Sequence, residues 1–361
     1  MPADVRYVFG DARTGAIYDE IPMEGVTVMD SLNGGEVQGT IGLQQTGRDS
    51  SDLYGATVPG KSFLVVERND QPIWGGLVWS RTYQSQAESV QVYAKTYDAY
   101  PTKRIMDFDQ SWTATDPRNI FLQLYQLMQV DPMAIQVDLP SAFTPDLSTI
   151  DFTVTGSELK TFRTAFDQLA QTDPGFEWRV VVTRVGGAYV RSLNVGLPYL
   201  GQPLGNTSAV FEYPGSILNF WRNDTISSSG TNVYGVGGGE GENMPIVEVV
   251  HDDLVSFGWP RFDVATPQKD IVDIDLLEKI TQSQAAILKA PSGIYTVEAK
   301  ADQSPQFGEW GIGDYAQLVL TSALEPRGLT TYKRIIQYDY TPPRADAVEE
   351  VRLTFEGDDL A

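Results

Sequence analysis

The sequence of 361 residues contains no cysteine and only one histidine, His251. The lack of cysteine excludes disulfides, thiolate metal sites and a cysteine nucleophile. The single histidine excludes a zinc site built from several histidines. A chain of this length buries about three quarters of its unfolded surface, so its fold does not depend on such staples.

Basic residues are also scarce, because 26 Lys and Arg face 48 Asp and Glu and give a formal net charge of −22. Wrapping duplex DNA requires phosphate neutralisation by Lys and Arg, which this balance disfavours. No stretch approaches the roughly 18 apolar residues of a membrane-spanning helix. The N-terminal residues lack the basic and apolar regions of a signal peptide. We therefore expect a soluble protein, synthesised in a cytoplasm and without a membrane span.

Residues 1–98 favour short antiparallel strands joined by tight turns. Val5, Tyr7 and Phe9 alternate with other residues, and Asn33-Gly34-Gly35 is typical of a hairpin turn. Dense short strands of this kind predict a sandwich or a small barrel. We assign residues 1–98 to a first β-barrel.

Residues 99–206 predict an α+β insert with two helices. Asp116 and Pro117 are typical of a helix start, and apolar residues follow at helical spacing. A second helix is expected to begin at Ser157 and to end before Pro174. Strand patterns return in residues 207–239 and 292–361, which predict a second β-barrel.

Residues 240–291 are expected to form an acidic insert with one helix. From Glu240 to Asp275 there are nine acidic and two basic residues, a net charge of −7. Asp275 and Glu278 match a capping box at the start of the helix. The glycines of residues 235–241 indicate a flexible connector in front of this insert.

The two predicted barrels share a faint sequence echo. Residues 60–84 can be laid on residues 313–337 without a gap, with five identities in 25 positions. The identical pairs are Gly60/Gly313, Val66/Val319, Gly75/Gly328, Arg81/Arg334 and Gln84/Gln337. Each stretch has the pattern of a glycine turn, a strand, a turn and a long strand, which indicates a structural repeat.

Three patterns could carry chemistry, and each has a plainer interpretation. Residues 55–62, from Gly55 to Ser62, match the spacing of a phosphate-binding loop. However, Pro59 lacks an N–H and the following residues alternate like a strand, so a turn into a strand is favoured over a nucleotide-binding enzyme. His251 beside Asp252, or Asp107 near Asp109, could supply acid or base chemistry, but acidic neighbours arise by chance in this sequence.

Aromatic residues leave a second alternative open. Five of them could form a stacking platform for sugars, which would indicate a carbohydrate- or receptor-binding β-protein: Trp74, Trp79, Tyr93, Tyr97 and Tyr100. Aromatic side chains on strands are more often core residues or cross-strand pairs.

The unit Trp74-Gly75-Gly76-Leu77-Val78-Trp79, followed by an alternating strand and by Tyr97-Asp98 and Arg104, resembles a known family. It is similar to the hub proteins of long-tailed bacteriophages, also called tail-associated or minor tail proteins, especially those of actinobacteriophages. Gly76-Leu77 and the Asp98…Arg104 exit match the family pattern, although the leucine expected before the arginine is absent. By order of elements the resemblance covers most of the chain.

The resemblance implies a mainly β, α+β fold with two related antiparallel, tail-tube-like barrels that carry α/β insertions. It implies a homotrimer whose six barrels form a ring that continues or closes the tail tube at the tail tip of the virion. Partners would be the distal tail protein ring, the tape-measure protein and other minor tail or fibre proteins. No enzymatic activity, cofactor or metal is implied, and DNA would pass without specific binding.

The charge then has a physical interpretation. Three copies would carry a formal charge of −66, three times −22, and a negative lumen repels phosphate. The candidate lumen or interaction surface consists of acidic residues in the acidic insert: Glu240, Glu242, Glu248, Asp252, Asp253 and Asp263. An outer face is an equal alternative for them.

Overall fold

The computed structural model describes residues 3–44, 48–144, 149–172, 174–205, 209–227, 229–239, 241–289, 292–343 and 349–359. Strands make up 45% of it and helices 18%, with antiparallel pairing dominant. The predicted mainly β character is therefore confirmed. No helix in the described residues is long and apolar enough to cross a membrane.

The largest sheet has 14 strands. They are β1 (Val5–Asp11), β2 (Ile17–Glu20), β3 (Glu24–Ser31), β4 (Glu36–Gly42), β5 (Ser62–Arg68), β6 (Gln71–Gln84), β7 (Ser89–Thr96), β12 (Val210–Tyr213), β13 (Ile217–Thr225), β17 (Ser292–Lys300), β18 (Tyr315–Leu320), β19 (Leu329–Thr341), β20 (Glu350–Phe355) and β21 (Asp358–Asp359).

The other elements form three small sheets and the helices. The small sheets contain β8 (Gln110–Thr115) with β9 (Ile150–Val154), β10 (Glu177–Val185) with β11 (Ala188–Gly196), and β14 (Asn232–Gly237) with β15 (Ile246–Val250) and β16 (Asp263–Gln268). The helices are α1 (Ser50–Gly55), α2 (Pro117–Gln129), α3 (Phe162–Ala170), α4 (Asp252–Ser256) and α5 (Ile274–Leu288), with 3-10 turns η1 (Tyr97–Lys103), η2 (Gly156–Glu158) and η3 (Gly241–Asn243).

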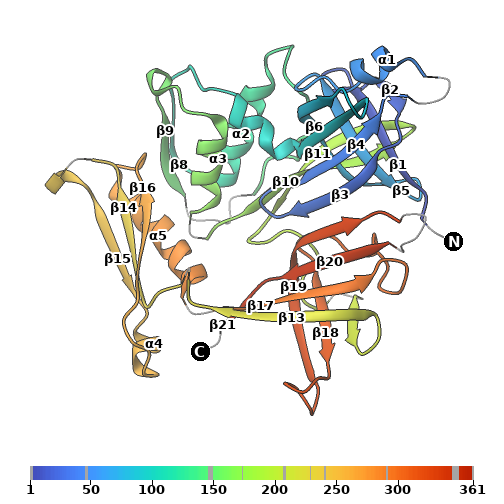
Figure 1. Ribbon diagram of the computed structural model, residues 1–361. Helices are drawn as coiled ribbons and strands as arrows, with labels where there is room; N and C mark the ends of the chain where they lie inside the picture. The colour runs from blue at the N-terminus through green and yellow to red at the C-terminus, as the bar shows by residue number, and fades with distance from the viewer. Residues whose placement is uncertain are drawn as a thin grey trace.

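The large sheet has two halves that are joined edge to edge. We call β1 to β7 the first half and β12, β13 and β17 to β20 the second half. Their joint is the antiparallel pair of β3 and β19, in which Ser31 lies opposite Gln337 and Val28 opposite Tyr340. In Figure 1 the blue first half lies directly above the orange and red second half.

The two halves repeat one order of strands. Neighbouring strands in the first half run β5-β6-β7-β4-β3, and in the second half β18-β19-β20-β17-β13. The chain visits the members of both series in the same sequence. The turn before the long strand pair also repeats, since the Gly60 N–H donates to Val78 and the Gly313 N–H to Ile335, both at 2.8 Å.

The repeat corrects the ungapped alignment of the two stretches. Val78 and Ile335 each precede a bulge against the next strand, so they are equivalent. Arg81 then corresponds to Tyr338 and not to Arg334, a shift of four residues. The sequence similarity correctly indicated that the two stretches are equivalent strand pairs. The identities that it gave in β6 and β19, however, join residues that are not structurally equivalent.

Strand pairing among the described residues leaves both halves open, so a closed barrel is not seen. The strands that pair with β5 and β18 also differ between the halves. β1 pairs antiparallel with β5, whereas β12 pairs parallel with β18. The two-barrel arrangement stays a prediction.

Among the described residues, three hydrophobic clusters pack the sheets and helices together. The largest lies within both halves, from Phe9 to Phe355, so the halves share one core. The second joins residues 97–195 to the opposite face of β5 and β6, with Phe63 and Leu77 as contacts. The third is small and lies beneath α5.

The first insert helix begins where the sequence predicts, and the second does not. Asp116 caps α2, because its Oδ1 accepts the Arg118 N–H at 2.9 Å. Ser157 lies in η2, and Leu159 has a left-handed backbone with φ of 50°, which a helix cannot contain. Thr161 therefore caps α3.

The glycines of residues 235–241 do not simply form a connector, since Gly235 and Gly237 lie inside β14. A Cβ on Gly235 would lie 1.8 Å from the Thr281 Oγ1 of α5, so only glycine allows this approach. α5 itself is capped by Asp273 and not by Asp275. The acidic segment also contains a second, short helix, α4, where one helix was predicted.

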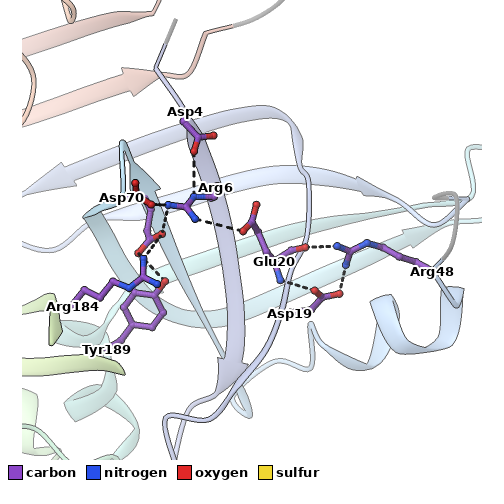
Figure 2. A network of polar contacts seen from close by, with 9 residues as sticks. Asp4, Arg6, Asp19, Glu20, Arg48, Asp70, Arg184 and Tyr189 are labelled. Atoms are coloured by element: carbon purple, nitrogen blue, oxygen red, sulfur yellow. Dashed lines mark hydrogen bonds and ion pairs between the residues drawn. The ribbon is translucent and has the colours of Figure 1, made fainter. Parts of the chain in front are cut away.

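Polar contacts fasten the β10–β11 hairpin to the first half. The buried Glu67 of β5 lies 3.4 Å from Arg6 of β1, accepts the Tyr189 hydroxyl at 2.9 Å and pairs with Arg184 at 3.2 Å. Figure 2 shows Arg6 surrounded by carboxylates, with Arg184 and Tyr189 approaching from the hairpin. Burial, followed by Glu67, raises the pKa of Tyr189.

Candidate functional site

One surface of the joined sheet is polar and carries little net charge over both halves. Along each strand buried apolar residues alternate with residues that face solvent, as in β4 and β7. Paired strands share this face, so the polar residues form continuous rows across the β3–β19 joint. We name it the polar sheet face. Met29 and Trp221 also lie on it, and its uncharged polar members include Thr27, Ser31, Gln38, Thr40, Ser80, Thr82, Gln91, Asn219, Thr296, Gln337 and Thr354.

Most charged side chains on this face lie opposite charges of the other sign. Arg352 donates to Glu298 at 2.7 Å, with Asp339 opposite on β19. In the first half Lys95 lies opposite Glu36, and in the second Lys300 lies opposite Glu350. With Glu24, which lies opposite Thr40, five carboxylates and three cations leave a formal charge of −2 on the face, in a chain whose total is −22.

Glu36 also accepts a hydrogen bond from the Tyr93 hydroxyl. Desolvation and then this carboxylate raise the pKa of Tyr93 to about 12. Tyr93 is therefore neutral near pH 7 and acts on the face as a hydrogen-bonding group without charge.

A buried ionic network fixes the two halves to each other. Arg68 of β5 makes a bidentate pair with Glu349, at 2.9 and 2.6 Å, and donates to the Phe307 carbonyl at 2.9 Å. The Tyr340 hydroxyl donates to the same carboxylate at 2.9 Å. These hydrogen bonds, with that of Glu349 first, raise the pKa of Arg68. The network holds the relative position of the halves on which the polar sheet face depends.

A second buried cluster lies where the insert meets the β3–β19 joint. Arg179 pairs with Asp30 at 2.5 Å, and the Asp98 carboxylate accepts the Val180 N–H at 2.7 Å. Burial raises the pKa of Asp98 to about 6 despite the nearby Arg179. The motif residue Asp98 thus supports the fold at a junction of β7, β10 and the joint.

Two predicted acidic site residues come together on the three-stranded sheet. Glu248 accepts hydrogen bonds from the Tyr234 hydroxyl at 2.7 Å and from Asn232 at 3.0 Å. Arg261 lies between the two carboxylates, 3.7 Å from Glu248 and 2.9 Å from Asp263. These contacts partly neutralise the pair, and its Tyr234 hydrogen bond lowers the pKa of Glu248.

The other acidic candidates lie apart from this pair. Asp252 and Asp253 begin α4, and Asp253 pairs with Lys289 at 2.6 Å, which lowers its pKa. Glu240 lies outside the described residues, and Glu242 is described only by its backbone in η3. β14, β15 and β16 do not join the 14-stranded sheet and lie at the far side of the molecule in Figure 1. The role of this acidic surface stays a prediction.

The remaining residues that the sequence motifs singled out lie where they support the fold. Lys61 is followed by β5 and not by a helix, so the helix N-terminus that a phosphate-binding loop requires is not formed behind it. His251 is buried, and its Nε2 lies 3.1 Å from the Ala285 carbonyl. Asp109 accepts the Gly156 N–H at 2.8 Å. No group of His, Asp or Glu in the described residues is arranged to hold a metal ion.

The aromatic residues do not form one platform. Trp74 belongs to the shared core of the two halves, whereas Tyr97 is buried in the cluster on the other face of the sheet. Lys95 and Lys103 lie against Trp79, 5.7 and 5.6 Å from its ring. The predicted sugar platform of five aromatic residues is therefore wrong, because β6 directs Trp74 into the shared core while Tyr97, in η1, is buried on the other side of the sheet.

The polar sheet face was not predicted from the sequence. The signal was present as the polar members of alternating strands, such as Gln38 and Thr40 in residues 36–42 or Gln91 and Tyr93 in residues 89–96. The sequence does not give the register in which the strands pair, and only that register shows that these residues share one face.

No family model matches the sequence, and no curated protein matches it. Solved structures do match along the whole chain. A tail protein of prophage MuSo2 from Shewanella oneidensis has a TM-score of 0.60 at 11% identity and covers 97% of this chain and 98% of its own. A tail protein from Neisseria meningitidis has a TM-score of 0.61 at 11% identity, covering 98% and 97%. A Francisella PdpA–VgrG complex has a TM-score of 0.59 at 10% identity, covering 99% and 58%. This chain therefore has the fold of phage tail proteins.

Proposed function

We propose that this chain is a structural component of a phage tail, a hub whose trimeric ring continues or closes the tail tube at the tail tip. The supporting observation is the match over nearly the full length of two phage tail proteins, with no large segment left over on either side. The repeated strand order adds to this, because two equivalent halves per chain allow three copies to present six similar units.

In this proposal the polar sheet face lines the passage. Hydroxyl and amide groups keep such a surface wet, and the nearly balanced charges offer DNA few unpaired cations to bind. DNA can then slide along the face without being held. The acidic surface near Glu248 and Asp263 lies on a separate small sheet, which suits contact with neighbouring proteins better than a tube lining. Those neighbours are the distal tail ring, the tape-measure protein and other minor tail or fibre proteins.

The proposal includes no catalysis and no cofactor. It places the protein in the virion after synthesis in the host cytoplasm. The acid–base candidates His251 and Asp109 support this, because both side chains are engaged by backbone groups.

The test is to find the chain in assembled particles. Gold-labelled antibody and electron microscopy of the phage should place it at the tail tip, and deletion of its gene should give particles without a finished tip. Mass measurement in solution, or of chains extracted from particles, should give three times 39.8 kDa. Label elsewhere than on the tail, or complete tails without the gene, would refute the proposal.

A further inference from the structure

Two of the open strand edges of the large sheet, in the described chain, belong to β13 and β6. β13 is the last strand of the sheet and pairs only with β17. β6 pairs along its whole second part with β7, but β5 ends opposite Leu77, so residues 80–84 have no strand on their other side. Open edges expose backbone N–H and C=O groups that can pair with another strand.

Inside the chain the equivalents of these two edges are already paired with each other. Val78 corresponds to Ile335, so residues 80–83 of β6 correspond to residues 337–340 of β19. From Ser80, the paired residues on successive strands of the first half are Tyr93, Gln38 and Thr27. From Gln337, those of the second half are Thr354, Thr296 and Trp221. Thr27 of β3 is therefore the equivalent of Trp221 of β13. Residues 28–31, which pair with residues 337–340 at the joint, therefore correspond to residues 222–225.

We propose that a second copy of this chain adds its β13 to β6, in the register that β3 adopts on β19. Ser80 would then lie opposite Thr225, Arg81 opposite Asp224, Thr82 opposite Asn223 and Tyr83 opposite Arg222. The inference rests on the proposed function for ring closure, but the edge pairing itself follows from the repeat.

The opposed residues are chemically complementary. Arg81 would face the carboxylate of Asp224, whose side chain is 51% exposed and pairs with Arg222 of its own strand at 2.9 Å. The guanidinium of Arg222 would face Tyr83, which is 51% exposed, and a cation over a tyrosine ring is favourable. On the other face the new pairs are small and polar, so they would continue the polar sheet face.

Helix α1 leaves room for this strand. Tyr54 of α1 lies against Arg81, 3.6 Å from ring centre to guanidinium carbon, and 6.4 Å from Tyr83. In the second half Phe307 lies in the same way against Tyr338 and Tyr340, at 5.0 and 4.7 Å. Because β3 pairs with β19 beside Phe307, the equivalent contact of Tyr54 does not block β6.

The pairing must be between copies. Six strands separate β13 from β6 within one chain, so its own edges cannot meet. A contact that joins one edge to a different edge is head-to-tail, and such contacts form a ring when the rotation closes.

The absence of cysteine allows a direct test. Thr82→Cys and Asn223→Cys, combined in one otherwise complete chain, place thiols on directly opposed residues of neighbouring copies. A short thiol cross-linker should join copies into covalent species of up to three chains. Each single variant, and Thr40→Cys with Asn223→Cys as the matched control, should stay uncrosslinked, because Thr40 lies on β4, which is paired on both sides and is separated from β6 by β7.

Charge exchange gives a second, independent measurement. Arg81→Glu and Asp224→Arg should each weaken association by about tenfold, and the two together should restore it, whereas the exposed Arg327→Glu should have no effect. A wild-type trimer without cross-linking and without the exchange effect would overturn the edge pairing and leave the proposed function standing. Cross-linked ladders longer than three chains would support the pairing but contradict the ring. A wild-type chain that is monomeric at every concentration and does not cross-link would overturn the pairing.

Discussion

At the scale of single residues, buried ionic clusters determine how the parts of the chain meet, and two of them lie at the joints of the halves and of the insert. Arg68 and Glu349 join the halves, and Asp98 and Arg179 lie at the edge of the insert. Most other charges are at the surface, where ion pairs contribute little to stability. Substitutions in the two clusters should therefore have large effects.

Glu349→Ala removes the carboxylate from the bidentate pair and leaves Arg68 buried without a counter-charge. We expect a loss of about 3–5 kcal/mol in the free energy of unfolding, because an unpaired buried charge cannot regain its hydration. Urea unfolding measures this loss. Arg352→Ala, in the exposed pair with Glu298, should cost less than about 1 kcal/mol. Equal losses for the two variants would contradict the assigned role of the buried network.

Asp98 should make stability depend on pH in the acidic range. Its pKa of about 6 lies above its ordinary value of 3.8, so the folded chain binds this proton more tightly than the unfolded chain. The resulting stability is complete below about pH 4 and is lost as the pH rises through 6, by up to about 3 kcal/mol in total.

Asp98→Asn keeps an acceptor for the Val180 N–H but removes the titration. The free energy of unfolding of the wild type should therefore fall relative to that of the variant as the pH rises from 4 to 7. Parallel profiles for the two proteins would show that Asp98 titrates normally in the folded chain.

At the scale of elements, the close packing of a helix on a strand explains why glycines lie inside a strand, where their low strand propensity would not place them. β14 contains glycines because α5 lies directly against it, as Gly235 and Thr281 show. The small sheet and α5 thus form a packed unit where the sequence indicated a loose connector.

Gly235→Ala should destabilise that unit, since its Cβ would overlap the Thr281 hydroxyl, which is buried and donates to the Leu277 carbonyl at 2.7 Å. We expect a loss of about 1–3 kcal/mol, seen as faster proteolysis within α5 and a lower unfolding temperature. Thr281→Ala should restore part of the loss in the double variant. Gly42→Ala, where a Cβ meets nothing within 4 Å, is the control; a loss as large there would point to a general effect of removing glycine.

At the scale of the whole molecule, two surfaces compete for the role of tube lining. The polar sheet face crosses both halves, whereas the acidic surface lies on a separate small sheet. Because DNA responds to cations at close range, added or removed charge distinguishes the two surfaces.

Gln38→Lys with Gln91→Lys adds cations to the polar sheet face and should slow DNA release from otherwise complete particles. Neutralising the acidic surface, with Glu248→Gln and Asp253→Asn, should leave the release rate within about twofold of the wild type. Time-resolved ejection measurements on particles carrying each variant provide the test. Slower release in the second variant alone would assign the lining to the acidic surface.

The sequence by itself determined the character of the elements. Alternation predicts the strands, Asp116 and Pro117 predict the start of α2, and the echo between the halves indicates two similar units. These features depend on neighbours in the chain, such as a cap two residues away. The expectation of phage tail character agrees with the fold that the solved structures share.

Only the tertiary structure decided which residues share a face and which edges meet. The β3–β19 joint pairs residues about 300 positions apart, and a shift of one residue in its register would turn every side chain to the other face. Leu159 and Gly235 likewise take conformations or neighbours that local propensity does not encode. The polar sheet face and the open edges of β6 and β13 arise from this long-range pairing, whose energy depends on contacts that no short stretch of sequence contains.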